Sequence, residues 1–191
     1  MHHSIFISKM IVIDFNDSFT YNIVSEIYQH YKNVTVIHYQ AVSFEFLKDL
    51  ETKNDLLGVV LGPGPGHPLE YNKVFPAIDY MLQRPKKFKL LGICLGHQII
   101  GSILGYSIVD SCNKVHGESV KIKYNDDSFI VQRYNSLVPR AKGLEIEKLV
   151  EDDEVVIFAD KSFVSFQFHP ESIGTENSNI FFNMFYDLLG K

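Results

Sequence analysis

The sequence has few cysteines, no long apolar run and no excess of basic residues. Its 191 residues contain only Cys94 and Cys112, which are too few for a disulfide scaffold and fit a reducing cytosol better than secretion. A formal net charge of −5 argues against a nucleic acid or an anionic membrane surface as the main partner. No stretch approaches the roughly 20 apolar residues of a membrane-spanning helix. We therefore expect a cytoplasmic protein with no nucleic-acid and no membrane partner.

The first nine residues are expected to form a short N-terminal extension. Residues 5–7 are apolar, but they are too few to span a membrane and no basic segment precedes them, so a signal peptide is not expected. The rest of the chain has no internal repeat, no low-complexity tract and no Pro/Gly-rich linker. With 46% hydrophobic residues, residues 10–191 are expected to build one domain with a substantial core.

Apolar runs alternate with segments of helical periodicity through the first half of the chain. The runs that predict buried strands lie at residues 11–13, 34–37, 56–61 and 90–94. This alternation predicts an α/β fold with a mostly parallel central sheet and helices on both faces. Strand-like runs in the second half lie at residues 120–124, 129–131, 144–146, 155–157 and 163–168. A helix over residues 180–189 is predicted to close the chain.

Cys94 lies in a Gly-x-Cys-x-Gly motif, directly after the apolar run that ends at Leu91. In this pattern a strand delivers a nucleophile into a sharp turn, and a helix begins immediately behind it. Gly92 and Gly96 leave room for the turn and for the neighbouring strands. The positive end of the helix then stabilises a thiolate. The motif predicts that Cys94 is a nucleophile, whereas Cys112 matches no motif and is expected to be a buried or incidental thiol.

The segment His169-Pro170-Glu171 supplies the other groups that a cysteine nucleophile requires, a base and a partner that orients the base. Pro170 holds His169 in an extended conformation. Side chains two residues apart in an extended segment point to the same side. We therefore predict that His169 is the base and that the carboxylate of Glu171 lies beside its imidazole.

A loop rich in glycine and proline, residues 62–68, follows the strand predicted at 56–61. Loops after the carboxyl ends of parallel strands form the ligand site in such folds. Because Pro65 has no N–H, an oxyanion donor in this loop is either Gly64 or Gly66. The N–H of Leu95, the residue after the nucleophile, is expected to be the second donor.

Together, the Cys94 motif, the Pro-Gly-Pro-Gly loop and the segment 167–172 (Gln-Phe-His-Pro-Glu-Ser) resemble the class I, triad-type glutamine amidotransferases. The resemblance covers nearly the whole chain from Met10 onward. It implies a flavodoxin-like sheet and hydrolysis of L-glutamine by a Cys-His-Glu triad, with the ammonia passed to a synthase domain or subunit. It implies no metal and no other cofactor for this half of the reaction.

The resemblance also implies which groups hold the amino-acid end of glutamine. They are the side chain of Gln98 and the main chain at Ser136 and Leu137. Gln98 lies one helical turn beyond Cys94, so both side chains can face one cavity.

Residues 13–22 resemble the N-terminal signature of the glutaminase subunits of anthranilate synthase and aminodeoxychorismate synthase, as do residues 116–119 and 133–137. This implies that the partner is a separate, chorismate-binding synthase subunit. Three positions differ from the family's usual residues. The family usually has His where Asn135 stands, Lys where Glu118 stands and Ser where Gly62 stands.

Other functions stay open at this point. The chain could be a glutaminase for another synthase, such as GMP or carbamoyl phosphate synthase, although the segment 17–22 argues against this. It could be a cysteine hydrolase of the same fold that cleaves γ-glutamyl bonds, or a regulatory protein without activity, which the intact triad disfavours. The sequence does not distinguish anthranilate from aminodeoxychorismate as the product.

Overall fold

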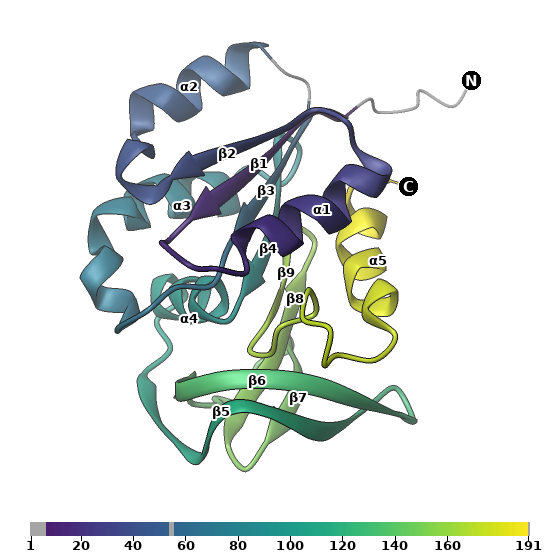
Figure 1. The fold of residues 1–191 in the computed structure, drawn as a ribbon. Helices are drawn as coiled ribbons and strands as arrows, with labels where there is room; N and C mark the ends of the chain where they lie inside the picture. Colours follow the sequence, from purple (N-terminus) through teal and green to yellow (C-terminus); the bar gives the residue numbers. More distant parts are fainter. Residues whose placement is uncertain (1–6, 54–55, 191) are drawn as a thin grey trace.

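The computed structural model describes residues 7–53 and 56–190, which build a central sheet between two layers of helices (Figure 1). The sheet has seven strands in the order β2-β1-β3-β4-β9-β8-β7. In that order the strands span Val34–His38, Ile7–Asp14, Leu56–Leu61, Phe88–Ile93, Phe163–Phe166, Glu154–Asp160 and Glu147–Glu151. The first five are parallel to one another, and β8 pairs antiparallel with both of its neighbours, β9 and β7. The predicted α/β fold with a mostly parallel sheet is confirmed.

The first strand begins earlier than the apolar pattern predicts. β1 starts at Ile7, where Ile7 pairs with Leu56 and Lys9 pairs with Leu57, whereas the sequence places its start near Met10. The reason is that main-chain pairing with β3 does not depend on apolar side chains, so the strand continues past the apolar run. Residues 7–9 of the expected extension therefore belong to the sheet, and residues 1–6 lie outside the described residues.

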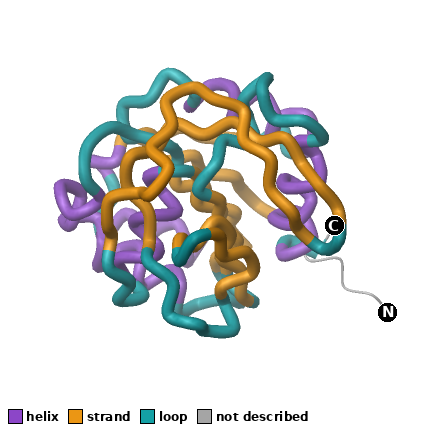
Figure 2. Tube along the Cα trace, turned by 90° about the horizontal axis from the view of Figure 1, so that it is seen from below, coloured by secondary structure: helices purple, strands orange, loops and turns teal. Residues whose placement is uncertain are grey.

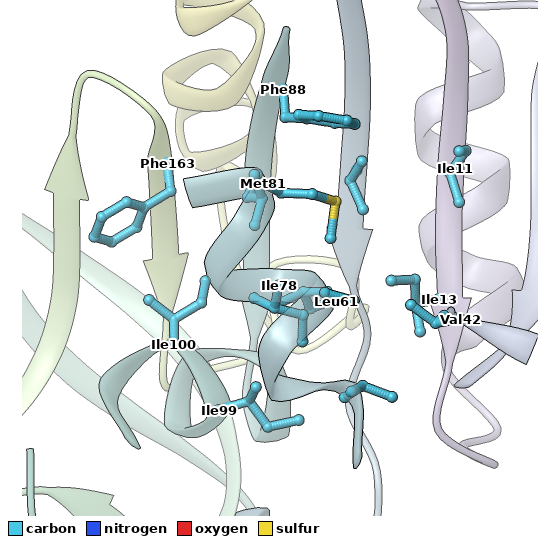
Figure 3. Close-up of a cluster of buried hydrophobic side chains, with 14 of the residues drawn as sticks. Ile11, Ile13, Val42, Leu61, Ile78, Met81, Phe88, Ile99, Ile100 and Phe163 are labelled. Carbon is cyan, nitrogen blue, oxygen red and sulfur yellow. The ribbon is translucent and has the colours of Figure 1, made fainter. Parts of the chain in front are cut away.

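Helices cover both faces of the sheet because successive side chains of its strands point to opposite faces. Ile11 and Ile13 pack with the helices α2, α3 and α4, while Met10 and Val12 pack with α1 and α5. Figure 3 shows the first of these two cores, with side chains of α3 and α4 packed against β1, β3 and β4. The α-helices span Thr20–His30, Phe44–Lys53, Phe75–Leu82, Leu95–Ile103 and Ser178–Leu188, and two 3-10 helices span Tyr39–Ala41 and Pro68–Val74.

A two-stranded antiparallel ribbon stands apart from the central sheet. It consists of β5 (Ile108–Tyr124) and β6 (Asp127–Pro139) and contains the strands predicted at 120–124 and 129–131. Figure 2, seen from below, shows the long strands of this ribbon curving across the near end of the molecule. The ribbon brings residues 134–137 over the carboxyl end of β4, where Cys94 lies.

The strand predicted at residues 144–146 is wrong. Leu144 precedes a turn, and β7 begins only at Glu147, whose N–H donates to the carbonyl of Leu144 (3.0 Å). The carboxylate of Glu147 accepts hydrogen bonds from the N–H groups of Lys142 (2.8 Å) and Gly143 (2.9 Å). These bonds, with the positive φ of Gly143 (73°), fix a loop where the apolar pattern alone predicts a strand.

Candidate active site

Cys94 occupies the sharp turn between β4 and α4. Its backbone has φ 50° and ψ −100°, a conformation that non-glycine residues rarely adopt. Its N–H donates to the carbonyl of Phe166 (2.9 Å), and its carbonyl accepts from the N–H of Gln98 (3.1 Å). The strained residue is thus held on both sides, and its side chain stands at the N-terminus of α4, as the motif predicts.

Two glycines around Cys94 allow the close packing that this turn requires. A Cβ atom at Gly96 would lie 2.1 Å from the carbonyl oxygen of Leu61 on β3. A Cβ atom at Gly92 would lie 2.9 Å from the Cβ of Ser165 on β9. Only glycine fits at such distances. The structure thus confirms the prediction that both glycines leave room for the turn and for the neighbouring strands.

His169 and Glu171 form a buried pair beside Cys94. Nδ1 of His169 lies 2.7 Å from Oε1 of Glu171, and the two side chains are 2% and 0% exposed. Nε2 of His169 has no hydrogen-bond partner within the part of the chain that the structure describes. The Cys94 thiol is near enough to act electrostatically on the imidazole, although Sγ of Cys94 and Nε2 of His169 do not have the geometry of a direct hydrogen bond.

The surroundings of His169 favour its protonated form. Burial by itself lowers the pKa of His169, because it disfavours the charged imidazolium. The charge of Cys94 and the polar contact with its thiol oppose this effect, as do the hydrogen bond and the charge of Glu171. Together they raise the pKa well above the usual 6.5. The arrangement therefore favours an imidazolium beside Cys94, which is the partner that a reactive cysteine nucleophile requires.

Two aromatic rings cover the imidazole of His169. The ring of Phe19, from the loop between β1 and α1, lies 5.2 Å from the His169 ring, and the ring of Tyr134, on β6, lies 5.0 Å from it. The two aromatic rings also contact each other at 5.4 Å. Both lie in segments of the sequence resemblance, but no local pattern indicated this role.

A cavity of about 370 Å³ opens in front of Cys94. It is lined by Gly64, Pro65, Gly66, Cys94, Gln98, His116, Tyr134, Asn135, Ser136 and Leu137. Seven of these ten were predicted site residues, and the structure brings them together from three separate segments. His116, Tyr134 and Asn135 were not predicted to line it, although each lies in a segment that the resemblance covers. The volume is in the range of small-molecule sites.

The loop of residues 62–68 packs tightly between the nucleophile and the 3-10 helix η2 (Pro68–Val74). A Cβ atom at Gly64 would lie 2.5 Å from Cδ2 of Leu95, so Gly64 stands directly against the start of α4. Gly66, with φ 75°, faces the carboxylate of Glu70 instead. The hydroxyl of Tyr71 donates to the carbonyl of Pro65 (2.9 Å). Leu95 does not line the cavity with its side chain, which is buried against this loop.

A buried ion pair supports the opposite wall of the cavity. Nη2 of Arg133 lies 3.2 Å from Oε2 of Glu154, and their side chains are 3% and 7% exposed. Nε of Arg133 donates to Oδ1 of Asn135 (3.0 Å), and Nδ2 of Asn135 donates to the carbonyl of Leu137 (3.3 Å). The pair thereby orients the main chain predicted to hold the substrate. Sequence reasoning missed it, because Arg133 and Glu154 meet only through the tertiary fold.

His97, three residues after Cys94, ties α4 to the sheet. Its Nε2 lies 2.9 Å from the carbonyl of Val155, which only accepts, so Nδ1 is free to accept from the hydroxyl of Ser165 (2.9 Å). Complete burial lowers the pKa of His97 to about 4. It therefore stays neutral at physiological pH and serves the framework of the site.

Further properties of the described residues concern the second thiol, metals and membranes. Cys112 is exposed on β5. Within residues 7–53 and 56–190, His, Cys, Asp and Glu side chains do not gather in groups of three that would hold a metal ion. In the same ranges, every helix is too short or too polar to cross a membrane.

Comparison with known proteins gives matches over most of the chain. A model of the family "Glutamine amidotransferase class-I" matches residues 11–188. The chain is 34% identical over 188 residues to the "Bifunctional protein TrpGD" of Thermotoga maritima, covering 90% of this chain and 31% of that protein. It is 33% identical over 181 residues to the "Anthranilate synthase component 2" of Helicobacter pylori, covering 87% of this chain and 90% of that protein. The chain thus spans less than a third of the first relative and most of the second.

Solved structures show the same fold. A putative GMP synthase subunit from Thermoplasma acidophilum aligns with a TM-score of 0.74 at 18% sequence identity, covering 97% of this chain and 95% of that one. A glutamine amidotransferase from Thermotoga maritima aligns with a TM-score of 0.62 at 18% identity, covering 89% of this chain and 77% of that one. At these identities the likeness concerns the fold alone.

Proposed function

This chain belongs to the class I glutamine amidotransferase family, and we propose that it is the glutaminase subunit of a chorismate-using synthase. In this proposal it hydrolyses L-glutamine to glutamate and ammonia, and a separate subunit uses the ammonia to make anthranilate or aminodeoxychorismate. One observation carries the hydrolysis: Cys94, on a strained turn at a cavity, lies beside the buried pair of His169 and Glu171. The relatives named anthranilate synthase component 2 support the choice of partner.

The first chemical step forms a thioester. The thiolate of Cys94 attacks the side-chain amide carbon of glutamine, and the carbonyl electron pair moves onto oxygen. When this tetrahedral species collapses, the C–N bond breaks and the His169 imidazolium gives its Nε2 proton to the departing nitrogen, which leaves as ammonia. Glu171 accepts the hydrogen bond from Nδ1 and stabilises the imidazolium form beforehand.

The second step releases glutamate. Water attacks the thioester carbon while Nε2 of His169, now neutral, takes a proton from it. The C–S bond then breaks, glutamate leaves, and the thiolate–imidazolium pair of Cys94 and His169 is restored. In this scheme the protein supplies the nucleophile, the acid and the base from its own side chains.

Main-chain N–H groups would stabilise the oxyanion. We assign the two donors to Leu95 and Gly64 rather than to Leu95 and Gly66. Gly64 packs against the side chain of Leu95, the residue after the nucleophile, whereas a Cβ atom at Gly66 would meet the carboxylate of Glu70. A carboxylate beside the donor would repel the developing negative charge.

The experiment that tests this function measures glutamate release from L-glutamine by the purified chain, alone and with candidate partners. We expect slow release by the chain alone and activation by the chorismate-binding component of anthranilate synthase or aminodeoxychorismate synthase. The synthetase component of GMP synthase serves as the comparison and should not activate. Full activity of the lone chain, or activation by the GMP synthase component only, would overturn the proposed coupling.

The segment after β1 is a proposed point of contact with the partner. Because β1, β3 and β4 are parallel, the carboxyl ends of β1 and β4 lie at the same end of the sheet. Asp17 and the Cys94 turn therefore lie at the same end of the molecule. Oδ1 of Asp17 accepts from the N–H of Phe19 (2.8 Å), and Phe19 packs on His169. A partner contact at Asp17 would therefore act on the base, His169, through Phe19.

Charge reversal at this position separates docking from chemistry. Asp17→Lys is expected to weaken activation by the partner more than it lowers basal hydrolysis. Asp17→Asn keeps an oxygen for the Phe19 N–H and removes only the charge, so it is the matched control and should have a smaller effect. The readout is the glutaminase rate against partner concentration. Unchanged activation curves for both variants would remove this segment from the interface.

A further inference from the structure

Gln167 is a completely buried amide that contacts the nucleophile. Its side chain is 0% exposed, and its Nε2 lies 3.8 Å from Sγ of Cys94, a hydrogen-bond distance for sulfur. Its main-chain N–H donates to the carbonyl of Val156 (3.0 Å), which fixes the residue against β8. Gln167 precedes His169 by two residues, so one segment brings both side chains to Cys94.

A second amide holds Gln167 at its other end. Oε1 of Gln167 accepts from Nε2 of Gln98 (3.3 Å), and the same nitrogen donates to the carbonyl of Leu137 (2.8 Å). An amide nitrogen carries two hydrogens, so Gln98 uses one for each partner. A continuous path of hydrogen bonds therefore leads from the cavity wall at Leu137, through two amides, to the sulfur of Cys94.

This path determines which end of the Gln167 amide faces the sulfur. Because Gln98 donates to Oε1 of Gln167, the NH₂ group of Gln167 is the end directed at Cys94. An N–H donor stabilises a thiolate, since hydrogen bonds to charged groups are the stronger ones. The reversed amide would instead place a carbonyl oxygen against the negative charge.

Gln167 is absent from the described residues that line the cavity, whereas Gln98 and Leu137 are among them. Its effect on the reaction therefore passes through Cys94 and not through contact with a bound substrate. We propose that Gln167 is a positioning residue: it holds the Cys94 thiolate through Nε2 and is itself held by Gln98. The nucleophile is thereby linked to the cavity wall that recognises the substrate. The identity of the substrate in this inference rests on the proposed function, whereas the contact with the thiolate does not.

The test measures alkylation of Cys94 by iodoacetamide, a small neutral reagent without an amino-acid end. All variants carry Cys112→Ser, because the exposed Cys112 would also react. Gln167→Met removes the donor at similar volume and is expected to slow alkylation about tenfold. Gln167→Glu keeps the shape but places a carboxylate near the thiolate, so it should be slower still. The kcat for glutamine should fall with the alkylation rate, while KM changes less than about twofold.

Another buried glutamine provides the matched control. Gln132 on β6 is 7% exposed, and its amide oxygen accepts from the hydroxyl of Ser119 (3.2 Å). Gln132→Met also removes a buried amide, and it should leave the alkylation rate within about twofold of the parent. Thermal unfolding of each variant identifies any that is not folded at the temperature of the assay. If Gln167→Met does not fold, the nearly isosteric Gln167→Glu still tests the donor.

A double-mutant cycle tests the link to Gln98. Gln98→Met should slow alkylation less than Gln167→Met, and the double variant should be no slower than Gln167→Met, because the path is already broken. Independent, multiplying effects would overturn the link. Alkylation of Gln167→Met and Gln167→Glu at the parent rate would overturn the positioning role. A parent protein that releases no glutamate with any partner would overturn the proposed function alone, since the alkylation rates do not depend on glutamine.

Discussion

Nδ1 of His169 lies 2.7 Å from Oε1 of Glu171, and neither side chain is more than 2% exposed. A carboxylate in such a place is stable only if its charge is compensated. The imidazolium of His169 supplies that charge, and Cys94 acts on the same ring. The three side chains therefore depend on one another, and removing one should change the properties of the others.

Replacing the base should cost as much activity as removing the nucleophile. His169→Ala is expected to lower single-turnover release of glutamate at least about a thousandfold, because the members of such a triad act as a unit. Glu171→Gln should cost less, about ten- to a hundredfold, because it keeps the size and some hydrogen bonding of Glu171. An active His169→Ala variant would move the base to another residue.

The pH profile of Glu171→Gln gives a second check on the pair. The charge of Glu171 is one of the causes that raise the pKa of His169. Without it the imidazolium, which protonates the leaving nitrogen, is lost at a lower pH. The alkaline limb of the kcat profile should therefore move to lower pH in this variant. A limb that stays in place would mean that Glu171 does not act on His169.

Protonation of His97 should destabilise the fold below neutral pH. The folded-state pKa of about 4 lies below the unfolded value of 6.5, so the unfolded chain binds the proton first. The contribution of neutral His97 to the unfolding free energy is complete above pH 6.5. It is lost as the pH falls toward 4, by up to about 1.4 kcal/mol per pH unit and about 3 kcal/mol in total. The contribution of His169, whose pKa is raised, is lost only as the pH rises above 6.5.

Guanidinium unfolding at pH 7 and pH 5 measures this effect. The difference in unfolding free energy between the two pH values should be smaller in His97→Gln than in the unmodified protein. His30→Gln replaces an exposed histidine on α1 and serves as the control. An identical pH dependence in His97→Gln would contradict the neutral, buried state assigned to His97.

Breaking the buried ion pair should affect both stability and substrate binding. Glu154→Leu leaves the guanidinium of Arg133 buried without its partner, which is expected to cost about 3–5 kcal/mol of unfolding free energy. KM for glutamine should rise, because Asn135 and the main chain at Leu137 lose their support. The double variant Arg133→Met/Glu154→Leu should regain much of the stability, since it buries no charge.

An exposed ion pair on α2 is the comparison for this prediction. Lys53 and Asp49 are 66% and 55% exposed, so Asp49→Ala should change the unfolding free energy by less than about 1 kcal/mol. Chemical denaturation and steady-state kinetics give both quantities. A Glu154→Leu variant as stable as Asp49→Ala would contradict the structural role of the buried pair.

Two glycines on α4 separate steric need from helix propensity. Alanine is the better helix former by about 1 kcal/mol, but a Cβ atom at Gly96 would lie 2.1 Å from a main-chain oxygen of β3. Gly96→Ala should therefore shift the N-terminus of α4, with a loss of activity and of more than about 2 kcal/mol of stability. Gly101→Ala meets only side-chain atoms of Pro139 and Phe158, at 3.2 Å or more, and should be close to neutral. Equal effects would contradict the tight turn.

The parts of the site that the sequence predicted are those set by local chain geometry. The turn at Cys94 follows from five consecutive residues, and the pairing of His169 with Glu171 follows from a spacing of two. The contacts that were missed join residues far apart in the chain, such as Gln167 with Gln98 and Arg133 with Glu154. No local pattern encodes these, because they arise when separate elements pack.

The fold was likewise predicted where local patterns determine it and missed where contacts between other residues do. Apolar periodicity predicted the parallel strands and their helices, since each buried face leaves a repeat in the sequence. It failed at residues 144–146, where hydrogen bonds donated by two main-chain N–H groups to a single carboxylate, that of Glu147, shape the loop. It also gave no indication that β5 and β6 form a separate ribbon, because alternation in a strand does not specify which sheet the strand joins.

The most direct measurement is the covalent state of Cys94 during turnover with L-glutamine. Samples are quenched in acid, the modified residue is located by mass spectrometry, and glutamate release is followed in parallel with the synthase subunit present. We expect a γ-glutamyl thioester on Cys94. We expect it to be absent in Cys94→Ser, together with at least an about thousandfold lower release of glutamate and retention of synthesis from added ammonium. An adduct on another residue, or glutamate release by Cys94→Ser at a rate near that of the unmodified protein, would contradict Cys94 as the nucleophile.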